Sequence, residues 1–124
     1  MPASKQSSIP ADRLAAYERA VATLPGVERK GASVPYTSVN GHMFSYLSAD
    51  GRLALRLAPA DRDSFMARYH ARLHEAYGIV QKEYVTVPDD LLTDTAALAP
   101  HLAASFAYVS ALKPKPTTRK SSAP

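Results

Sequence analysis

The sequence predicts an α+β fold in which helices flank an antiparallel sheet, made of a three-strand meander plus a fourth strand. Two dipeptides predict the meander, because Asn40-Gly41 and Asp50-Gly51 each stand between runs of strand-forming residues. Asn-Gly and Asp-Gly are favoured in two-residue type I′ turns, in which both central residues have φ > 0. In the sequence before and after the meander, apolar residues recur at helical spacing. We therefore expect helices that cover the sheet.

Length and composition limit the class of protein. With 124 residues, 46% of them hydrophobic, the chain is long enough for one domain with a modest core. No apolar run approaches membrane-spanning length, and the N-terminus lacks the apolar stretch of a signal peptide. We therefore expect a cytoplasmic protein with no membrane partner. The absence of cysteine excludes disulfides, thiolate nucleophiles and cysteine-ligated zinc.

The net charge of +4 comes from the ends of the chain. All 11 acidic residues lie between Asp12 and Asp94. Five of the 15 basic residues lie outside that span: Lys5, Lys113, Lys115, Arg119 and Lys120. The body therefore has ten basic and eleven acidic residues, a net charge of −1. A basic chain suggests nucleic-acid binding, but the charge supports it only for the tail.

The N-terminal part is expected to hold a short disordered segment and one helix. Residues 1–10 are polar and contain two prolines, which is typical of disorder. Asp12 is a candidate N-cap of this helix, and Pro25-Gly26 is expected to end it. The apolar residues between them recur near helical spacing: Leu14, Tyr17, Val21 and Leu24.

Two-residue loops would fix the register of the meander. They place Val39 opposite His42 and Ala49 opposite Arg52, and side chains alternate between faces with period two. The face expected to be buried carries Pro35, Thr37, Val39, Phe44, Tyr46, Leu53, Leu55 and Leu57. The second face is too apolar to be simply solvated and too polar for an ordinary core. It carries Val34, Tyr36, Ser38, Met43, Ser45, Leu47, Ala54 and Arg56.

One candidate ligand site lies on this second face. Tyr36, Ser45 and Arg56 would form a cross-strand row. An arginine beside two hydroxyls can hold a carboxylate or a phosphate, so the row is a candidate site for a small anion. The alternative is that Arg56 pairs with a protein carboxylate such as that of Glu83.

The same face holds a candidate interaction surface. Val34, Met43 and Leu47 would lie together around Arg56. A contiguous apolar patch with arginine and aromatic neighbours indicates a protein partner, a covering helix or self-association.

A second helix is predicted to begin at residues 58–61, where the sequence APAD has proline and an acid in the first turn. Its apolar stripe, followed by Gly78 as terminator, is Phe65, Met66, Tyr69, Leu73 and Tyr77. On this helix His70 and His74, beside Glu75, would share one face at a spacing that can bind a metal. No HExxH pattern and no third ligand accompany them, so we predict no metal and no cofactor. His42 and His101 are isolated and expected to be structural or solvated.

The remaining elements are a strand, a short turn and a last helix. Residues 82–87 alternate as a fourth strand that Pro88 stops. Residues 88–92 predict one helical turn, after which Asp94 or Thr95 caps a helix that contains Pro100. That helix carries Leu98, Leu102, Phe106 and Val109. From Lys113 onward, the basic, proline-rich segment 113–124 is expected to be an extended flexible tail.

This order of elements, with NGHMFSYLSADGRLALRL in the meander and EYVTVPDDLL after the second helix, resembles the N-terminal domain of the TfoX/Sxy family. The resemblance covers residues 11–112 and implies an α+β body with a regulatory role. In full-length members a helical C-terminal domain follows, and the protein regulates natural competence in bacteria. Only the tail follows Leu112 here, so the resemblance is to stand-alone members and the competence role is not carried over. More distantly, the chain resembles the MmcQ/YjbR group, which has a similar body and for which DNA contact has been suggested.

We therefore predict a non-enzymatic regulatory or protein-interaction module. No serine–histidine–acid order, phosphate-binding glycine loop or paired-carboxylate motif is present, so no catalytic residue is assigned. The expected partner is a protein of unknown identity or a second copy of the chain. One alternative is binding of the anion at the sheet face described above. Another is weak, salt-dependent nucleic-acid binding through Lys113, Lys115, Arg119 and Lys120.

Overall fold

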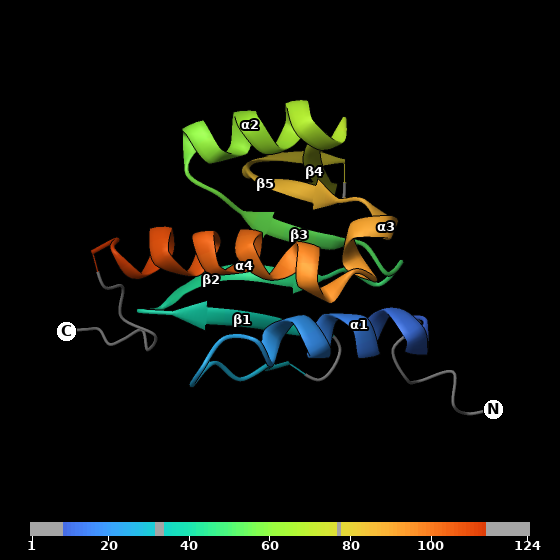
Figure 1. Cartoon of the computed structure of the whole chain (residues 1–124). Helices are drawn as coiled ribbons and strands as arrows, with labels where there is room; N and C mark the ends of the chain where they lie inside the picture. Colours follow the sequence, from blue (N-terminus) through green and yellow to red (C-terminus); the bar gives the residue numbers. More distant parts are fainter. Residues whose placement is uncertain (1–8, 32–33, 77, 114–124) are drawn as a thin grey trace.

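A computed structural model describes residues 9–31, 34–76 and 78–113 of the chain (Figure 1). They form helices and an antiparallel sheet with the strand order β1-β2-β3-β5-β4, which confirms the predicted α+β class. The strands are β1 (Tyr36–Val39), β2 (His42–Leu47), β3 (Leu53–Arg56), β4 (Leu73–Ala76) and β5 (Ile79–Val87). The helices are α1 (Ala11–Val21), α2 (Pro59–Tyr69), α3 (Asp89–Leu92) and α4 (Thr95–Ser110).

Helices α1, α3 and α4 pack together on one face of the sheet, and α4 runs across the meander strands (Figure 1). Helix α2 lies beside β5, near the other end of the sheet. The core lies between the sheet and these helices. Its fully buried side chains include Tyr17, Leu47, Leu53, Leu55, Val85, Val87, Leu98, Leu102 and Val109.

The ends of the helices follow from local chemistry. Pro59 occupies the first turn of α2, where its missing N–H costs nothing. The Asp94 side chain caps α4 by accepting a hydrogen bond from the Ala97 N–H at 3.1 Å, and Pro100 lies inside the unbroken helix. None of the helices in the described part of the chain is long and apolar enough to cross a membrane.

The second helix is shorter than predicted. It ends at Tyr69, because His70 adopts the left-handed conformation with φ 55° and its N–H caps the Met66 carbonyl. Leu73 then begins the edge strand β4, and Gly78 (φ 75°) lies in the turn to β5 rather than at a helix end. The sheet therefore has a strand, β4, that the sequence pattern did not predict.

The first turn of the meander confirms the prediction, and the second differs from it. Asn40 and Gly41 both have positive φ, and Val39 pairs with His42. At the second turn the Ser48 N–H donates to the Arg52 carbonyl at 2.8 Å, which makes the loop one residue longer than a type I′ turn. The pairing of β2 with β3 is therefore shifted by one residue from the predicted register, so that Tyr46 lies opposite Ala54.

Strand β2 also contains a bulge at Phe44. Ser38 pairs with Met43 and Thr37 pairs with Ser45, so Phe44 is an extra residue in β2. Both Phe44 and Ser45 consequently contact the helices. The Phe44 ring packs edge-on against Phe106 of α4, at 5.6 Å between centroids.

With the bulge at Phe44 and the longer loop after β2, three residues lie on the face opposite to the one predicted. Ser45 and Leu47 were expected on the second face, but both are fully buried on the helix face. Tyr46 was expected among the residues under the helices, but its ring contacts His74 and Tyr84 on the opposite side of the sheet.

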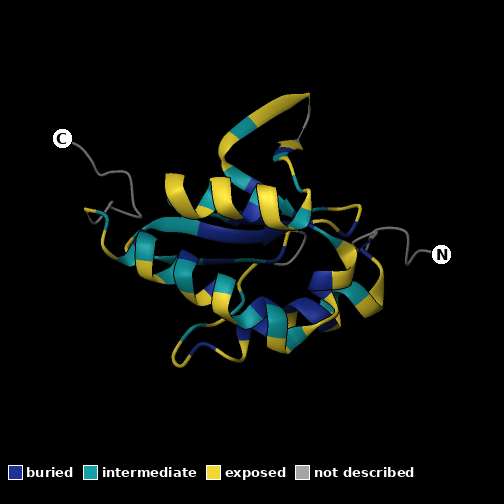
Figure 2. Ribbon diagram, turned by 45° about the horizontal axis from the view of Figure 1, so that its top comes forward, coloured by how far each residue is buried: buried dark blue, intermediate teal, exposed yellow. Residues whose placement is uncertain are grey.

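The β4–β5 hairpin covers part of the second face. The Tyr46 hydroxyl donates to Gln81 Oε1 at 2.7 Å, and the Tyr84 hydroxyl donates to the Met43 carbonyl at 2.8 Å. These bonds join β5 to β2 although β3 lies between them, so the hairpin curls over the sheet. Burial raises the pKa of Tyr84 to about 12. Figure 2 shows the far end of the hairpin standing out from the body.

The disordered N-terminal segment was predicted to include Ile9 and Pro10, which is wrong for these two residues. Ile9 is 9% exposed and belongs to the core cluster, and Pro10 is the N-cap of α1. Residues 1–8 lie outside the described part.

The first prediction concerns Ser105, whose buried hydroxyl lies 2.5 Å from the Arg56 carbonyl and 3.2 Å from that of Phe44. Ser105→Ala should lower the free energy of unfolding by roughly 1–3 kcal/mol, because the one hydroxyl hydrogen that lies between the two carbonyls is lost. The control is Ser110→Ala, which removes a bond within one helix turn and should cost less than about 0.5 kcal/mol. Urea denaturation measures both, and equal stabilities would contradict the role of Ser105.

Candidate functional site

The predicted row of Tyr36, Ser45 and Arg56 does not form. Tyr36 pairs with Tyr46, and Ser45 pairs with Leu55, so Ser45 and Arg56 belong to opposite faces. The Ser45 hydroxyl is buried and lies 2.7 Å from the Tyr17 hydroxyl and 2.5 Å from that of Thr37. A ligand therefore cannot reach Ser45.

Arg56 instead pairs with a carboxylate of the chain, as the alternative interpretation predicts. Its Nε donates to Glu83 Oε1 at 2.7 Å, and its guanidinium carbon lies 6.0 Å from the centre of the Tyr108 ring. The side chain is only 18% exposed. Arg56 thus joins β3, β5 and α4 rather than offering an anion site with Tyr36 and Ser45.

The predicted apolar surface of Val34, Met43 and Leu47 is not contiguous. Leu47 lies in the core with no exposed surface, because the shifted register turns it toward the helices. Met43 is partly buried, whereas Val34 is 42% exposed. The other two large apolar residues that are exposed on the described surface lie elsewhere.

These two residues lie at the tip of the β4–β5 hairpin. Ile79 is 66% exposed and Val80 is 48% exposed. Val80 borders an open groove of about 500 Å³ whose wall includes Met43, Arg56 and Tyr84. The sequence signal for this hairpin is a glycine between short runs of β-branched and apolar residues, which is weaker than Asn-Gly.

The histidines divide between two structural roles. His70 is the cap of α2 and His74 is a buried residue of β4, so they do not share a helical face. Within the described ranges, no group of three or more His, Asp or Glu side chains is arranged to hold a metal. His101 Nε2 lies 2.8 Å from the Tyr69 hydroxyl, and the His101 ring packs against Phe65, so of the two predicted roles, structural or solvated, His101 has the structural one.

Most of the basic tail lies outside the residues that the structure describes. Lys113 is exposed, and its carbonyl lies 2.8 Å from His42 Nε2. Lys115, Arg119 and Lys120 lie beyond the described residues. Nucleic-acid binding through the tail stays a prediction.

A cavity of about 280 Å³ opens beside the β2–β3 turn. Its wall is made by Val34, by β2 and the turn after it, and by two residues of β4, His74 and Glu75. Tyr46 and Ala49 contribute apolar surface, while Asp50 and Arg52 pair with each other at 3.3 Å. A hydrogen bond from Ser48 lowers the pKa of Asp50.

His74 gives this cavity its distinctive chemistry. The residue is 2% exposed, and its Nδ1 lies 2.8 Å from the Thr86 hydroxyl on β5. Its Nε2 is buried and has no hydrogen-bond partner, unlike every other buried side-chain nitrogen or oxygen in the described part of the chain. Desolvation lowers the pKa of His74 below the usual 6.5, so the ring is neutral at pH 7.

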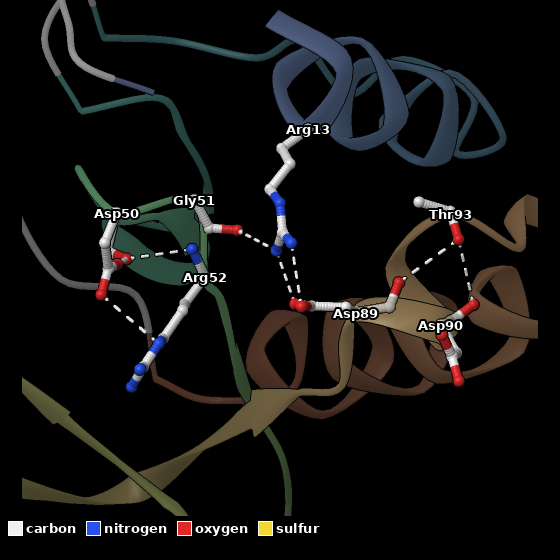
Figure 3. Close-up of polar contacts among 8 residues, drawn as sticks. Arg13, Asp50, Gly51, Arg52, Asp89, Asp90 and Thr93 are labelled. Atoms are coloured by element: carbon white, nitrogen blue, oxygen red, sulfur yellow. Dashed lines mark hydrogen bonds and ion pairs between the residues drawn. The ribbon is translucent and has the colours of Figure 1, made fainter. Parts of the chain in front are cut away.

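The turn beside the cavity is fixed by Arg13 of α1 (Figure 3). Its guanidinium donates to both carboxylate oxygens of Asp89, at 2.5 and 2.9 Å, and to the Gly51 carbonyl at 3.3 Å. The hydrogen bond from Arg13 lowers the pKa of Asp89. Gly51 has φ 85°, and a Cβ there would lie 2.7 Å from Arg13 Cδ. Helix α1, the turn and α3 are thereby joined at one point.

Comparisons with known proteins identify no relative. No family model, no curated protein and no solved structure matches this chain.

The second prediction concerns Gly51. Gly26→Ala should cost roughly 1–2 kcal/mol, since its φ of 77° is left-handed but the space around it is open. Gly51→Ala should cost more, because the same strain is combined with displacement of Arg13. Thermal or urea unfolding of both variants measures the contribution of the contact between residue 51 and Arg13. Equal losses of stability in the two variants would show that Arg13 does not restrain the turn.

The third prediction concerns pH. Because burial holds the pKa of His74 and of His101 below 6.5 in the folded chain, the unfolded chain binds more protons as the pH falls. Stability should be constant above about pH 6.5 and should decrease below it. Urea unfolding across that range tests this for wild type and for His74→Gln. The variant should lose less stability on acidification, and an identical loss would exclude His74 as a cause.

Proposed function

We propose that the chain is a non-enzymatic protein-interaction module with a regulatory role, and that the tip of the β4–β5 hairpin is its contact element. The observation that carries the proposal is the exposure of Ile79 and Val80, two adjacent β-branched residues that are 66% and 48% exposed. Single exposed apolar residues are ordinary. Two at the end of a hairpin that stands out from the body (Figure 2) offer a partner an apolar side chain on each side of the tip.

The surroundings of the tip support this use. Side chains alternate along β5, so Ile79 and Val80 point to opposite sides of the hairpin. On the side of Val80 the groove offers Met43, Tyr84 and Arg56, residue types that are enriched in protein interfaces. Lys82 and Glu83 provide a charged rim. A partner would thus bury the tip and contact the groove beside it.

The regulatory part of the proposal rests on the resemblance to the TfoX/Sxy N-terminal domain. The order predicted from the sequence, on which the resemblance rests, is a helix, a three-strand meander, a second helix, a strand and further helices; the structure adds β4 before that strand. The resemblance includes no catalytic signature, which supports a module that acts by binding.

The fourth prediction tests the contact element with a photo-crosslinking amino acid placed at residue 79, in cells that express the chain. The matched control carries it at Arg19, an exposed position of α1. We expect covalent adducts from position 79 and few from position 19. Ile79→Ser combined with Val80→Ser should weaken partner binding at least about tenfold while changing stability by less than about 1 kcal/mol.

One result identifies the class of partner, and another would contradict the proposal. Adducts of twice the mass of the chain, formed by the purified protein alone, would identify self-association through the hairpin. Adducts only from position 19, or partner binding unchanged in the double variant, would contradict the assignment of the hairpin.

A further inference from the structure

The buried nitrogen of His74 has a defined hydrogen-bonding character. The Thr86 hydroxyl has His74 Nδ1 as its hydrogen-bond partner among the described residues. If Nδ1 carried the proton, the Thr86 hydroxyl hydrogen would be left without an acceptor. If Thr86 donates to Nδ1, both groups are satisfied, and the ring proton is then on Nε2. The pairing with Thr86 therefore favours the tautomer in which Nε2 carries the proton, as a donor without an acceptor among the described residues.

An unpaired buried donor is costly, and His74, which carries it, is one of the residues that line the cavity. Leaving such a group unsatisfied opposes folding. The cavity of about 280 Å³ lies near the lower limit of small-molecule sites. Its lining combines the ring of Tyr46 with the small apolar groups of Val34 and Ala49, and it reaches the surface beside the β2–β3 turn.

The charges at the cavity limit the class of ligand. Asp50 and Glu75 contribute two carboxylates, and Arg52 contributes one guanidinium that is already paired with Asp50. The His74 ring is uncharged at pH 7 and adds no positive charge. An anion would meet a net negative charge, whereas a neutral acceptor would not.

We propose that this cavity is a binding site for a small neutral molecule with a planar apolar body and a carbonyl or ring-nitrogen acceptor. His74 Nε2–H donates to the acceptor, and the planar body packs against the Tyr46 ring. The residues of this site are distinct from Ile79 and Val80, so the proposal goes beyond the interaction surface and stands without it.

The probes are benzamide, which has these features, and benzoate, its anionic counterpart of equal shape. In a heteronuclear NMR titration of the full chain, benzamide should shift the His74 ring signals and the amides of Ser48, Arg52 and Glu75 in a saturable manner. For a molecule of this size we expect a dissociation constant on the order of 1 mM. Benzoate should bind several-fold more weakly.

Three variants make the test specific. His74→Asn keeps a polar atom near the position of Nδ1 for Thr86 but removes Nε2, and it should weaken benzamide binding about fivefold or more. Val34→Trp fills the cavity mouth from a residue that is 42% exposed; it should abolish binding with His74 intact, and it carries the test if His74→Asn does not fold. Ile79→Ser is the control and should bind benzamide like the wild type.

Several results would overturn the proposal. One is the absence of a saturable shift at benzamide concentrations up to about ten times the expected dissociation constant. In that case the Nε2 proton would have the Tyr46 ring as its partner, since the centres of the two rings are 5.4 Å apart. Equal binding by wild type and either cavity variant would exclude the site. Tighter binding of benzoate would exclude a neutral ligand.

Discussion

The bulge at Phe44 is the constraint on which the packing of this domain depends. One extra residue in β2 turns both Phe44 and Ser45 toward the helices. Phe44 then packs on α4, while Ser45 joins Thr37 and Tyr17 in a buried chain of hydroxyls. Burial raises the pKa of Tyr17 to about 12, so the Tyr17 hydroxyl in this row stays uncharged at neutral pH. Two helices that are far apart in the sequence are thereby attached to the same short segment of β2.

The curl of the β4–β5 hairpin determines the surface chemistry. It covers Tyr46 with His74 and Gln81, and so creates a second, smaller packed layer opposite the helices. The same curl leaves Ile79 and Val80 exposed at the tip and leaves a cavity beside His74 and Glu75 of β4. Both proposed sites thus involve one hairpin, and Glu75 of the cavity pairs with Val80 of the tip. A partner at the tip and a ligand in the cavity would act on the same local structure, whose edge strand β4 is short.

The fold class and most elements were predictable because their signals are local. Asn40-Gly41 determines its own turn, and Asp94 determines the start of α4. The faces of Ser45, Tyr46 and Leu47 were not predictable, since neither the bulge at Phe44 nor the longer loop at Gly51 has a signal as strong as Asn-Gly. The bulge reverses these three side chains, and the longer loop restores the predicted, buried face of Leu53 and Leu55. The apolar spacing of Phe65, Tyr69 and Leu73 also continues a helical pattern past its true end. That pattern placed His74 on a helix, and the cavity was missed for this reason.

The most direct test of this account is the pairing of β1 with β2, observed as cross-strand nuclear Overhauser contacts in solution. The bulge predicts that Thr37 faces Ser45 and that Tyr36 faces Tyr46, while Ser38 still faces Met43 next to the turn. Contacts that place Tyr36 opposite Ser45 and Thr37 opposite Phe44 would show an unbroken ladder. That result would return Ser45 to the second face and contradict the packing described for both layers.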